Sequence, residues 1–166
     1  MIFIYENKMI MENKYASADL IGRLKVIYTL QMANPSIEIT SMPITSRYDL
    51  RVYNPKKDKT DYLEIKDRNC EEHQYENAFL NIEKYNALSG YGENFHFVNI
   101  YTDGVIDGWQ PTKMPSSGIT KGEYYICKST VVESPRIKQE RYELNFNDIS
   151  WRVNNKVKNI VIDDKQ

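Results

Sequence analysis

The sequence lacks any long apolar segment. No apolar run approaches the roughly 20 residues that a membrane-spanning helix needs, and the first residues, MIFIYENK, become polar too soon for a secretory signal peptide. We therefore expect a cytoplasmic protein that makes no membrane contact.

Cysteine, histidine and glycine are also scarce. The two cysteines, Cys70 and Cys127, are far apart, which excludes a disulfide framework and the usual zinc spacing. Cys70 and His73 make one isolated C-x-x-H pair, so free thiols are expected, and His96 lies in an apolar run where packing is the expected role. The seven glycines are scattered, which excludes a phosphate-binding glycine loop, and no serine-hydrolase nucleophile elbow is present.

An excess of charge of either sign is absent as well. The chain has 22 Lys and Arg against 23 Asp and Glu, a net charge of −1. Proteins that bind nucleic acid by bulk charge are strongly basic, so any such binding must be local or metal-assisted. With 166 residues, 41% hydrophobic and 27% charged, the composition predicts one packed domain over residues 1–166.

Two segments show helical periodicity. Residues 17–34 predict a first helix that Ser17 can cap and Asn34-Pro35 ends. The segment QYENAFLNIEKYNALSGYG, which starts at residue 74, predicts a second helix, with Gly90 beyond its end. The predicted core stripe of the first helix consists of Leu20, Leu24, Ile27 and Leu30 or Gln31, with Ile21 and Tyr28 beside it; that of the second consists of Tyr75, Ala78, Phe79, Ile82 and Tyr85 or Asn86.

Alternating polar and apolar residues predict strands between and after these helices. The order is helix, three strands, helix, strand, and then more strands, which predicts two helical layers around a mixed sheet. Short links make the first three strands antiparallel, and the helical crossover lets the fourth run parallel to the third. The strands are expected within residues 36–44, 48–54, 62–66, 95–101, 123–132 and 141–146, with a turn at Asp103-Gly104.

One hairpin, RYDLRVYNPKKDKTDYLEIKDR, carries an unusual set of charges. Glu64 and Lys66 share one face of their strand, whereas Ile65 points into the core. Register can bring Asp49, on the preceding strand, beside Glu64. Two adjacent carboxylates repel, and a hard divalent cation relieves that repulsion. The carbonyl of Ile65 can add an oxygen, and a water near Lys66 can attack a phosphodiester.

The bare Glu-x-Lys pattern is not specific, because it also occurs at residues 6–8 and 12–14. Only residues 64–66 have an apolar middle residue, a strand pattern and an upstream strand with Asp. The competing interpretation is a solvated strand face with weak cross-strand charge pairs.

Residues 13–102 resemble the core of the PD-(D/E)XK nuclease superfamily, which includes restriction endonucleases and Holliday-junction resolvases. The resemblance rests on RYDLRV, YLEIKDR and the helical NKYASADLIGRLKV, although Tyr48 stands where the family has Pro. It implies an α/β, restriction-endonuclease-like αβββαβ core over about residues 13–104, with a mixed central sheet flanked by helices. Residues 105–166 would add a β-rich C-terminal extension.

The resemblance also implies an activity. Asp49, Glu64 and the Ile65 carbonyl would bind Mg²⁺, with Mn²⁺ able to substitute, and Lys66 would act on the attacking water. The expected function is a metal-dependent DNA endonuclease, and a homodimer follows by analogy with enzymes that cut both strands. The alternatives are a catalytically inactive nuclease-like module that binds nucleic acid or protein, and an unrelated α/β interaction protein whose hairpin bears salt bridges.

Further residues are weaker accessory candidates. Asp19 stands where related proteins carry Glu on the first helix, and Glu12 is a rival for that place. Arg68 is either a phosphate clamp or a surface charge. Gln74 and Lys84, expected on the second helix, are either auxiliary polar groups or part of its solvated face.

Overall fold

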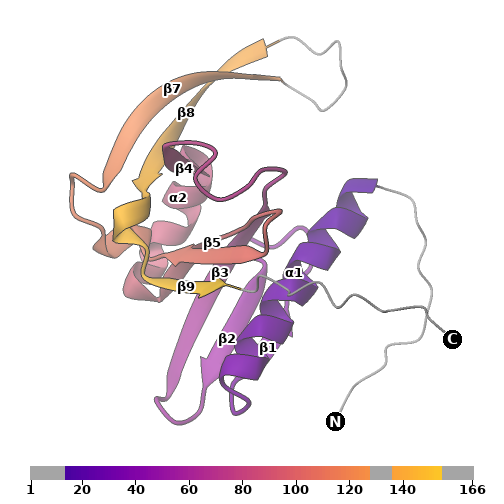
Figure 1. The fold of residues 1–166 in the computed structure, drawn as a ribbon. Coiled ribbons are helices and arrows are strands. Elements are labelled where there is room, and N and C mark those ends of the chain that lie inside the picture. The colour runs from indigo at the N-terminus through magenta and orange to yellow at the C-terminus, as the bar shows by residue number, and fades with distance from the viewer. Residues whose placement is uncertain (1–13, 128–135, 155–166) are drawn as a thin grey trace, which may run out of the picture.

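Two sheets form the framework of the protein (Figure 1). The computed structural model describes residues 14–127 and 136–154, and this part of the chain has a mixed α/β fold. In spatial order the large sheet consists of β1 (Glu38–Ser41), β2 (Leu50–Asn54), β3 (Lys59–Asp67), β5 (Phe95–Ile100), β6 (Val105–Trp109) and β9 (Trp151–Asn154).

The strand directions of the large sheet confirm the prediction. β1, β2 and β3 pair antiparallel, and β5 runs parallel to β3. Leu50 pairs with Leu63 in the central hairpin, which fixes its register. β5 then pairs antiparallel with β6 through the predicted turn, where Gly104 has a φ of 83° that favours glycine.

Helix α1 (Lys14–Ala33) covers one face of the large sheet. Its end before Asn34-Pro35 confirms the prediction, but it begins before Ser17, which therefore lies inside the helix and is no cap. Val26 is fully buried in the core of this face. The other buried members of that core are Leu50, Val52, Leu63, Ile65, Val98, Ile100 and Ile106.

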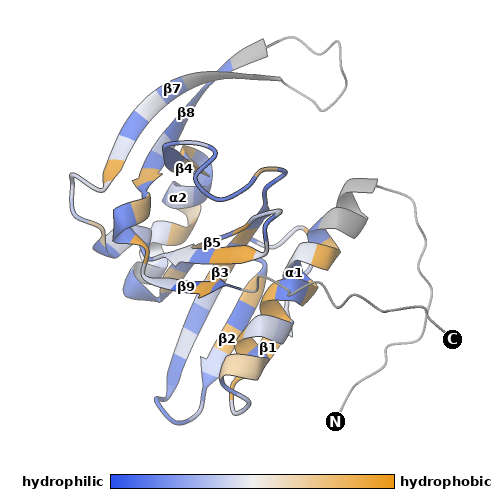
Figure 2. Cartoon of the chain, in the orientation of Figure 1, coloured by the Kyte–Doolittle hydropathy of each residue, from blue (hydrophilic) through white to orange (hydrophobic). Residues whose placement is uncertain are grey.

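The predicted core stripe of the first helix is only partly right. Ile27 and Leu30 pack against the core, whereas Leu20 and Leu24 are 48% and 55% exposed. The helix is apolar on two sides, so periodicity alone could not select the buried one; Figure 2 shows its orange apolar residues. We define the α1 stripe as its exposed apolar residues Leu20, Ile21, Leu24, Tyr28 and Met32.

Helix α2 (Ile82–Leu88) and the small sheet cover the opposite face. Trp109 and Leu144 are fully buried between the two sheets, and the indole N–H of Trp109 donates to the Asn145 carbonyl at 3.1 Å. The small sheet consists, in spatial order, of β4 (Asn77–Asn81), β8 (Arg136–Asn145) and β7 (Ile119–Cys127).

The prediction of a helix from residue 74 is wrong over its first half. Residues 77–81 form β4, in which Ala78 pairs with Leu144 of β8. Ala78 and Leu80 are buried on one side of β4, so long-range pairing outweighs the local helical period. Helix α2 begins after Asn81, whose side-chain oxygen accepts hydrogen bonds from two backbone N–H groups of the first turn.

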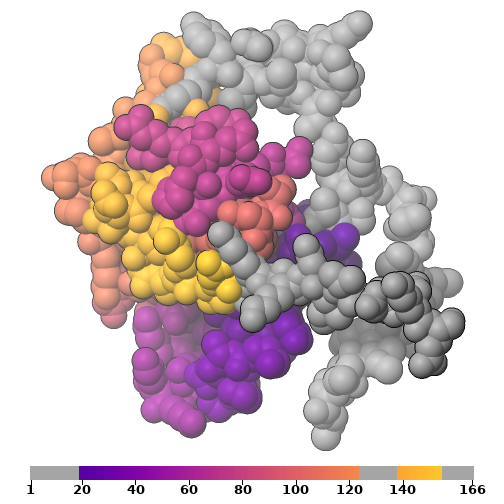
Figure 3. Space-filling model, viewed as in Figure 1, coloured from indigo at the N-terminus to yellow at the C-terminus, as the bar shows by residue number. Residues whose placement is uncertain are grey.

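The C-terminal region contributes to both sheets. The two strands predicted there correspond to β7 and β8, although residues 128–132 of the first prediction lie outside the described residues. The two strands form a ribbon that arches away from the rest of the fold (Figure 1). In Figure 3 the magenta loop before β4 lies beside the yellow residues near Phe146, whose ring centroid is 4.5 Å from that of His73. Short 3₁₀ turns span Ser89–Asn94, Pro111–Lys113 and Phe146–Asp148.

Within the described ranges, no helix is long and apolar enough to cross a membrane.

Candidate active site

Asp49 lies at the start of the central hairpin, one residue before β2. Its backbone N–H donates to the Leu63 carbonyl at 2.8 Å, so the β2–β3 register places Asp49 across from Glu64. Its carboxylate Oδ2 accepts the Ile65 N–H at 2.7 Å. The N–H and C=O of one strand residue point to the same side, so the Ile65 carbonyl also lies on this edge of β3. The register thus sets Asp49 beside the Glu64–Ile65 segment of β3.

Arg23 of α1 holds the other oxygen of Asp49. Its Nη2 donates to Asp49 Oδ1 at 2.7 Å, and Nη1 donates to the Met42 carbonyl. Arg23 Nε also forms an ion pair with Asp19 Oδ2 at 2.8 Å, which links the accessory candidate Asp19 to Asp49. The sequence analysis missed Arg23, although the i,i+4 pair with Asp19 on a predicted helix was a signal.

Glu64 is 1% exposed and faces α2. Its Oε2 accepts a hydrogen bond from Lys84 Nζ at 3.0 Å. Its Oε1 forms an ion pair with Lys66 Nζ at 3.1 Å but accepts no hydrogen bond from the described part of the chain. Lys84 therefore contacts a candidate site residue, while its side chain keeps 36% of its surface exposed to solvent.

The two carboxylates interact although they approach different helices. Burial raises the pKa of Asp49 above its ordinary value, and the negative charge of Glu64 raises it further. The Ile65 N–H and the Arg23 guanidinium lower the pKa of Asp49 but only in part. The ionised form of Asp49 is therefore disfavoured by its burial and by the nearby charge of Glu64.

The donor set suits a hard divalent cation. Glu64 Oε1 is a buried oxygen without a hydrogen bond, and Asp49 and the Ile65 carbonyl supply further oxygens at the same end of the hairpin. Among the described residues, no group of three or more His, Cys, Asp or Glu side chains converges. Magnesium keeps several waters and is commonly bound by one or two carboxylates, so two acids and a carbonyl fit it.

The remaining accessory candidates lie elsewhere. Arg68 is half-buried at the end of β3, where Nε donates to Asn99 Oδ1 at 3.0 Å and Nη2 to the Phe79 carbonyl at 2.6 Å, so its interpretation as a surface charge is wrong. Gln74 is exposed in the loop before β4 and is not on the second helix, contrary to the prediction. Glu12 lies outside the described residues.

The scarce thiol and imidazole groups take no part in this site. Cys70 is a free thiol, as expected, whereas the side chain of Cys127 lies outside the described part. His96 is packed, as predicted: the Trp151 indole N–H donates to its Nδ1 at 3.2 Å, so Nε2 carries the proton directed at Asp61, also at 3.2 Å.

Comparison of the chain with family models, with curated proteins and with solved structures found no match.

Proposed function

We propose that this protein is a magnesium-dependent DNA endonuclease of the restriction-endonuclease-like type. The observation that carries the proposal is the buried acid pair on neighbouring strands, with Lys66 two residues beyond the second acid on the same face. Glu64 is 1% exposed, and its Oε1 has an ion pair with Lys66 at 3.1 Å but accepts no hydrogen bond from the described residues. A role in binding a cation explains such a buried acid better than a solvated strand face does.

The strand arrangement supports the same proposal. The resemblance implies an αβββαβ order with a mixed sheet. In the described chain the order is a helix, four strands, a helix and a strand, and β1, β2, β3 and β5 pair antiparallel, antiparallel and parallel in succession. Strand β4 is an addition between β3 and α2.

The residues divide the chemistry between them. Asp49, Glu64 and the Ile65 carbonyl would hold the ion, which when bound offsets charge on the phosphate and acidifies a water. The side chain of Lys66 is 45% exposed, so its Nζ is accessible to donate a hydrogen bond to the attacking water and orient it. Lys84 fixes the Glu64 carboxylate from α2. Arg23 fixes Asp49 and, through it, the edge of β3.

The test is cleavage of supercoiled plasmid in Mg²⁺ by the wild type, Lys66→Ala and Lys57→Ala. Lys57 lies exposed in the turn of the same hairpin, so Lys57→Ala removes an equal charge outside the site. We expect Lys66→Ala to reduce the cleavage rate about 10²- to 10³-fold, the range typical of a lost proton-handling group, and Lys57→Ala to cleave at nearly the wild-type rate. Full cleavage by Lys66→Ala contradicts the assigned role.

The second candidate is an inactive nuclease-like module that binds nucleic acid or protein. It is favoured by one observation: both acids already have cationic partners within the chain, Arg23 for Asp49 and two lysines for Glu64. If those partners exclude an ion, divalent cations will produce neither binding heat nor cleavage, although nucleic acid still binds.

A homodimer belongs to the same proposal, because two active sites are needed to cut both strands at once. The α1 stripe supports it, since five large apolar side chains, each at least 48% exposed, occupy one side of the helix. We expect sedimentation to show a dimer for the wild type and a monomer for Leu24→Glu. A wild-type monomer at all accessible concentrations contradicts this part of the proposal.

A further inference from the structure

A basic cavity adjoins the candidate active site on the α2 face of the large sheet. Its volume is about 230 Å³, and the described residues that line it include four cations and no acid. Two of the cations, Lys66 and Lys84, also contact Glu64. We call this cavity the anion pocket and define it by Lys66, Arg68, Lys84, Gln139 and Arg141.

The two sheets each supply a pair of these residues. Lys66 and Arg68 are two residues apart where β3 ends, and Gln139 and Arg141 are two residues apart on β8. Alternation along a strand puts the members of each pair on one side. The pocket therefore exists only because the small sheet packs beside the end of β3, more than 70 residues further along the chain.

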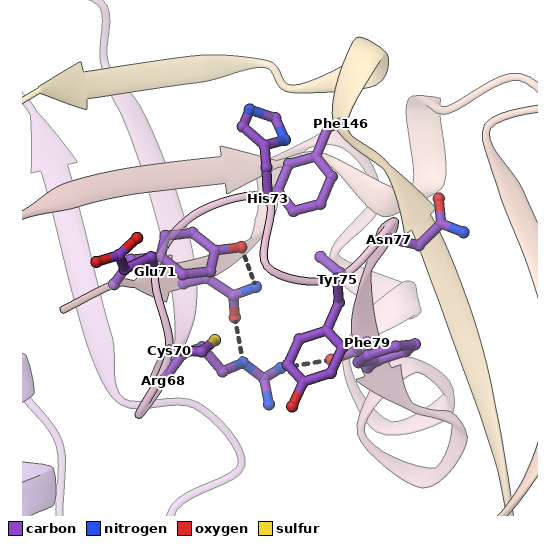
Figure 4. A pocket seen from close by; sticks show the side chains of 11 residues that line it. Arg68, Cys70, Glu71, His73, Tyr75, Asn77, Phe79 and Phe146 are labelled. Carbon is purple, nitrogen blue, oxygen red and sulfur yellow. Dashed lines mark hydrogen bonds between the residues drawn. The ribbon is translucent and has the colours of Figure 1, made fainter. Parts of the chain in front are cut away.

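The guanidinium groups are held in place. Figure 4 shows Arg68 beside Phe79, whose carbonyl accepts a hydrogen bond from the guanidinium. Arg68 also donates to Asn99, so both acceptors are neutral. Asn99 is itself fixed, because its amide donates to the Tyr101 hydroxyl at 3.1 Å. The Arg141 guanidinium carbon lies 3.6 Å from the centroid of the Phe79 ring, a cation–π contact.

This arrangement concentrates like charge in a partly buried place. Burial lowers the pKa of Arg68, and the positive charge of Arg141 lowers it further. Burial also lowers the pKa of Arg141. Partly buried cations that repel each other are stabilised by an anion that hydrogen bonds to them.

We propose that the anion pocket binds a backbone phosphate of the nucleic-acid substrate, next to the scissile phosphodiester at Glu64. The inference deepens the proposed function and rests on it. Planar guanidinium groups suit phosphate oxygens, and Gln139 can donate through its amide. The volume is enough for a phosphate and several waters, since one water occupies about 30 Å³. The cluster of cations in the anion pocket also explains how a chain of net charge −1 can bind a polyanion locally.

The test is binding of a fluorescein-labelled 12-nucleotide single-stranded DNA in EDTA, measured by fluorescence anisotropy. EDTA prevents cleavage, so binding is measured alone. We expect Arg141→Gln to raise Kd about tenfold and to reduce the slope of log Kd against log salt by about one ion. The matched control is Lys113→Gln, which removes one charge from an exposed ion pair with Glu93 and should change Kd less than twofold.

A gain-of-charge variant keeps the test decisive if Arg141→Gln fails to fold. Gln139→Lys adds a cation to the same pocket on an accessible strand, and we expect it to lower Kd several-fold. Equal affinities for the wild type, Arg141→Gln and Gln139→Lys overturn the proposal, as does an equal loss in Arg141→Gln and the Lys113→Gln control.

Competition separates the possible sources of the phosphate. Unlabelled oligonucleotide should displace the labelled strand at concentrations at least about 100-fold below those of inorganic phosphate or AMP, because several phosphates contact the protein together. Equal potency of inorganic phosphate overturns the assignment to a nucleic-acid backbone. If binding depends on Arg141 but Mg²⁺ produces no cleavage, the proposed phosphate binding in the anion pocket stands and only the proposed nuclease activity is refuted. Cleavage with unchanged binding by Arg141→Gln refutes the pocket alone.

Discussion

The β1–β2–β3 part of the large sheet and the β4–β8 pair of the small sheet differ in how far apart in the sequence their partners lie. In the large sheet, β1, β2 and β3 are consecutive hairpin neighbours, whereas β4 of the small sheet pairs with β8, as in Asn77 with Asn145. The chemistry follows the same division. The large sheet carries the acid pair and Lys66, and the small sheet adds Gln139 and Arg141 to the anion pocket. The β2–β3 hairpin, built from local contacts, holds the candidate ion site, and the β4–β8 pair of distant segments shapes the space beside it.

The largest effect should come from removing the buried acid of the large sheet. Glu64→Gln keeps the shape of the side chain but removes the charge that would hold a divalent ion. We expect a loss in kcat of about 10³-fold or more, in line with the loss of a metal ligand or a preorganised charge. Single-turnover cleavage in Mg²⁺ measures it. A kcat within tenfold of the wild type would assign the chemistry to some other group.

Stability should show whether the two sheets are one cooperative unit. Leu144 of β8 and Leu63 of β3 are 0% and 3% exposed, and each belongs to a different core cluster. The Leu144 cluster includes Phe95 and Trp109 of the large sheet. We therefore expect Leu144→Ala and Leu63→Ala each to lower the free energy of unfolding by about 2–4 kcal/mol. Circular dichroism and tryptophan fluorescence should report the same single urea transition in each variant. Separate transitions for the two probes in Leu144→Ala would show that the small sheet unfolds independently.

Residues of the small sheet should affect KM, whereas the site residues of the large sheet should affect kcat. Because Arg141 is assigned to substrate binding, Arg141→Gln should raise KM about tenfold, or about 1.4 kcal/mol, and leave kcat within about threefold of the wild type. Steady-state cleavage of a labelled duplex gives both constants. If kcat falls and KM stays constant, Arg141 acts on the transition state. The claim that the small sheet contributes only to substrate binding would then be wrong.

Sequence reasoning succeeded where contacts are local. The β2–β3 hairpin follows from strand alternation and short links, and the direction of β5 follows from the helical crossover before it. It failed at β4, because Ala78 and Leu80 fit a helical stripe as well as a strand, and only pairing with β8 decides between them.

The partners of the acids show the same limit. Lys84 was predicted on the correct helix, but its contact with Glu64 depends on how α2 crosses the sheet. The sequence signal for Arg23 was only its i,i+4 spacing from Asp19 on the predicted helix, which does not indicate a contact with Asp49. Arg141 lies in a region without a readable motif, and its place in the pocket depends on the pairing of β8 with β4.

The smallest predicted effect concerns pH and a polar contact of the large sheet. Burial alone would raise the pKa of Asp61, but hydrogen bonds from His96 and Lys59 hold it below its ordinary value. A lowered folded-state pKa means that the ionised carboxylate stabilises the fold above its unfolded pKa. That stabilisation disappears as the pH falls through the folded-state pKa.

We therefore expect Asp61→Asn to cost about 0.5–1.5 kcal/mol at pH 7. The difference in unfolding free energy between variant and wild type should shrink as the pH falls from 5 toward 2, as urea denaturation at each pH would show. A constant difference across this range would assign the loss to packing instead of to the charge of Asp61.

Titration of the protein with Mn²⁺ by isothermal calorimetry addresses the central claim most directly. If the carboxylates of Asp49 and Glu64 form one ion site, the wild type will give a saturable heat for one ion per chain. Asp49→Asn and Glu64→Gln will each abolish that heat, while Lys113→Gln will retain it. No saturable heat from the folded wild type, or equal heat from both acid variants, would contradict the account.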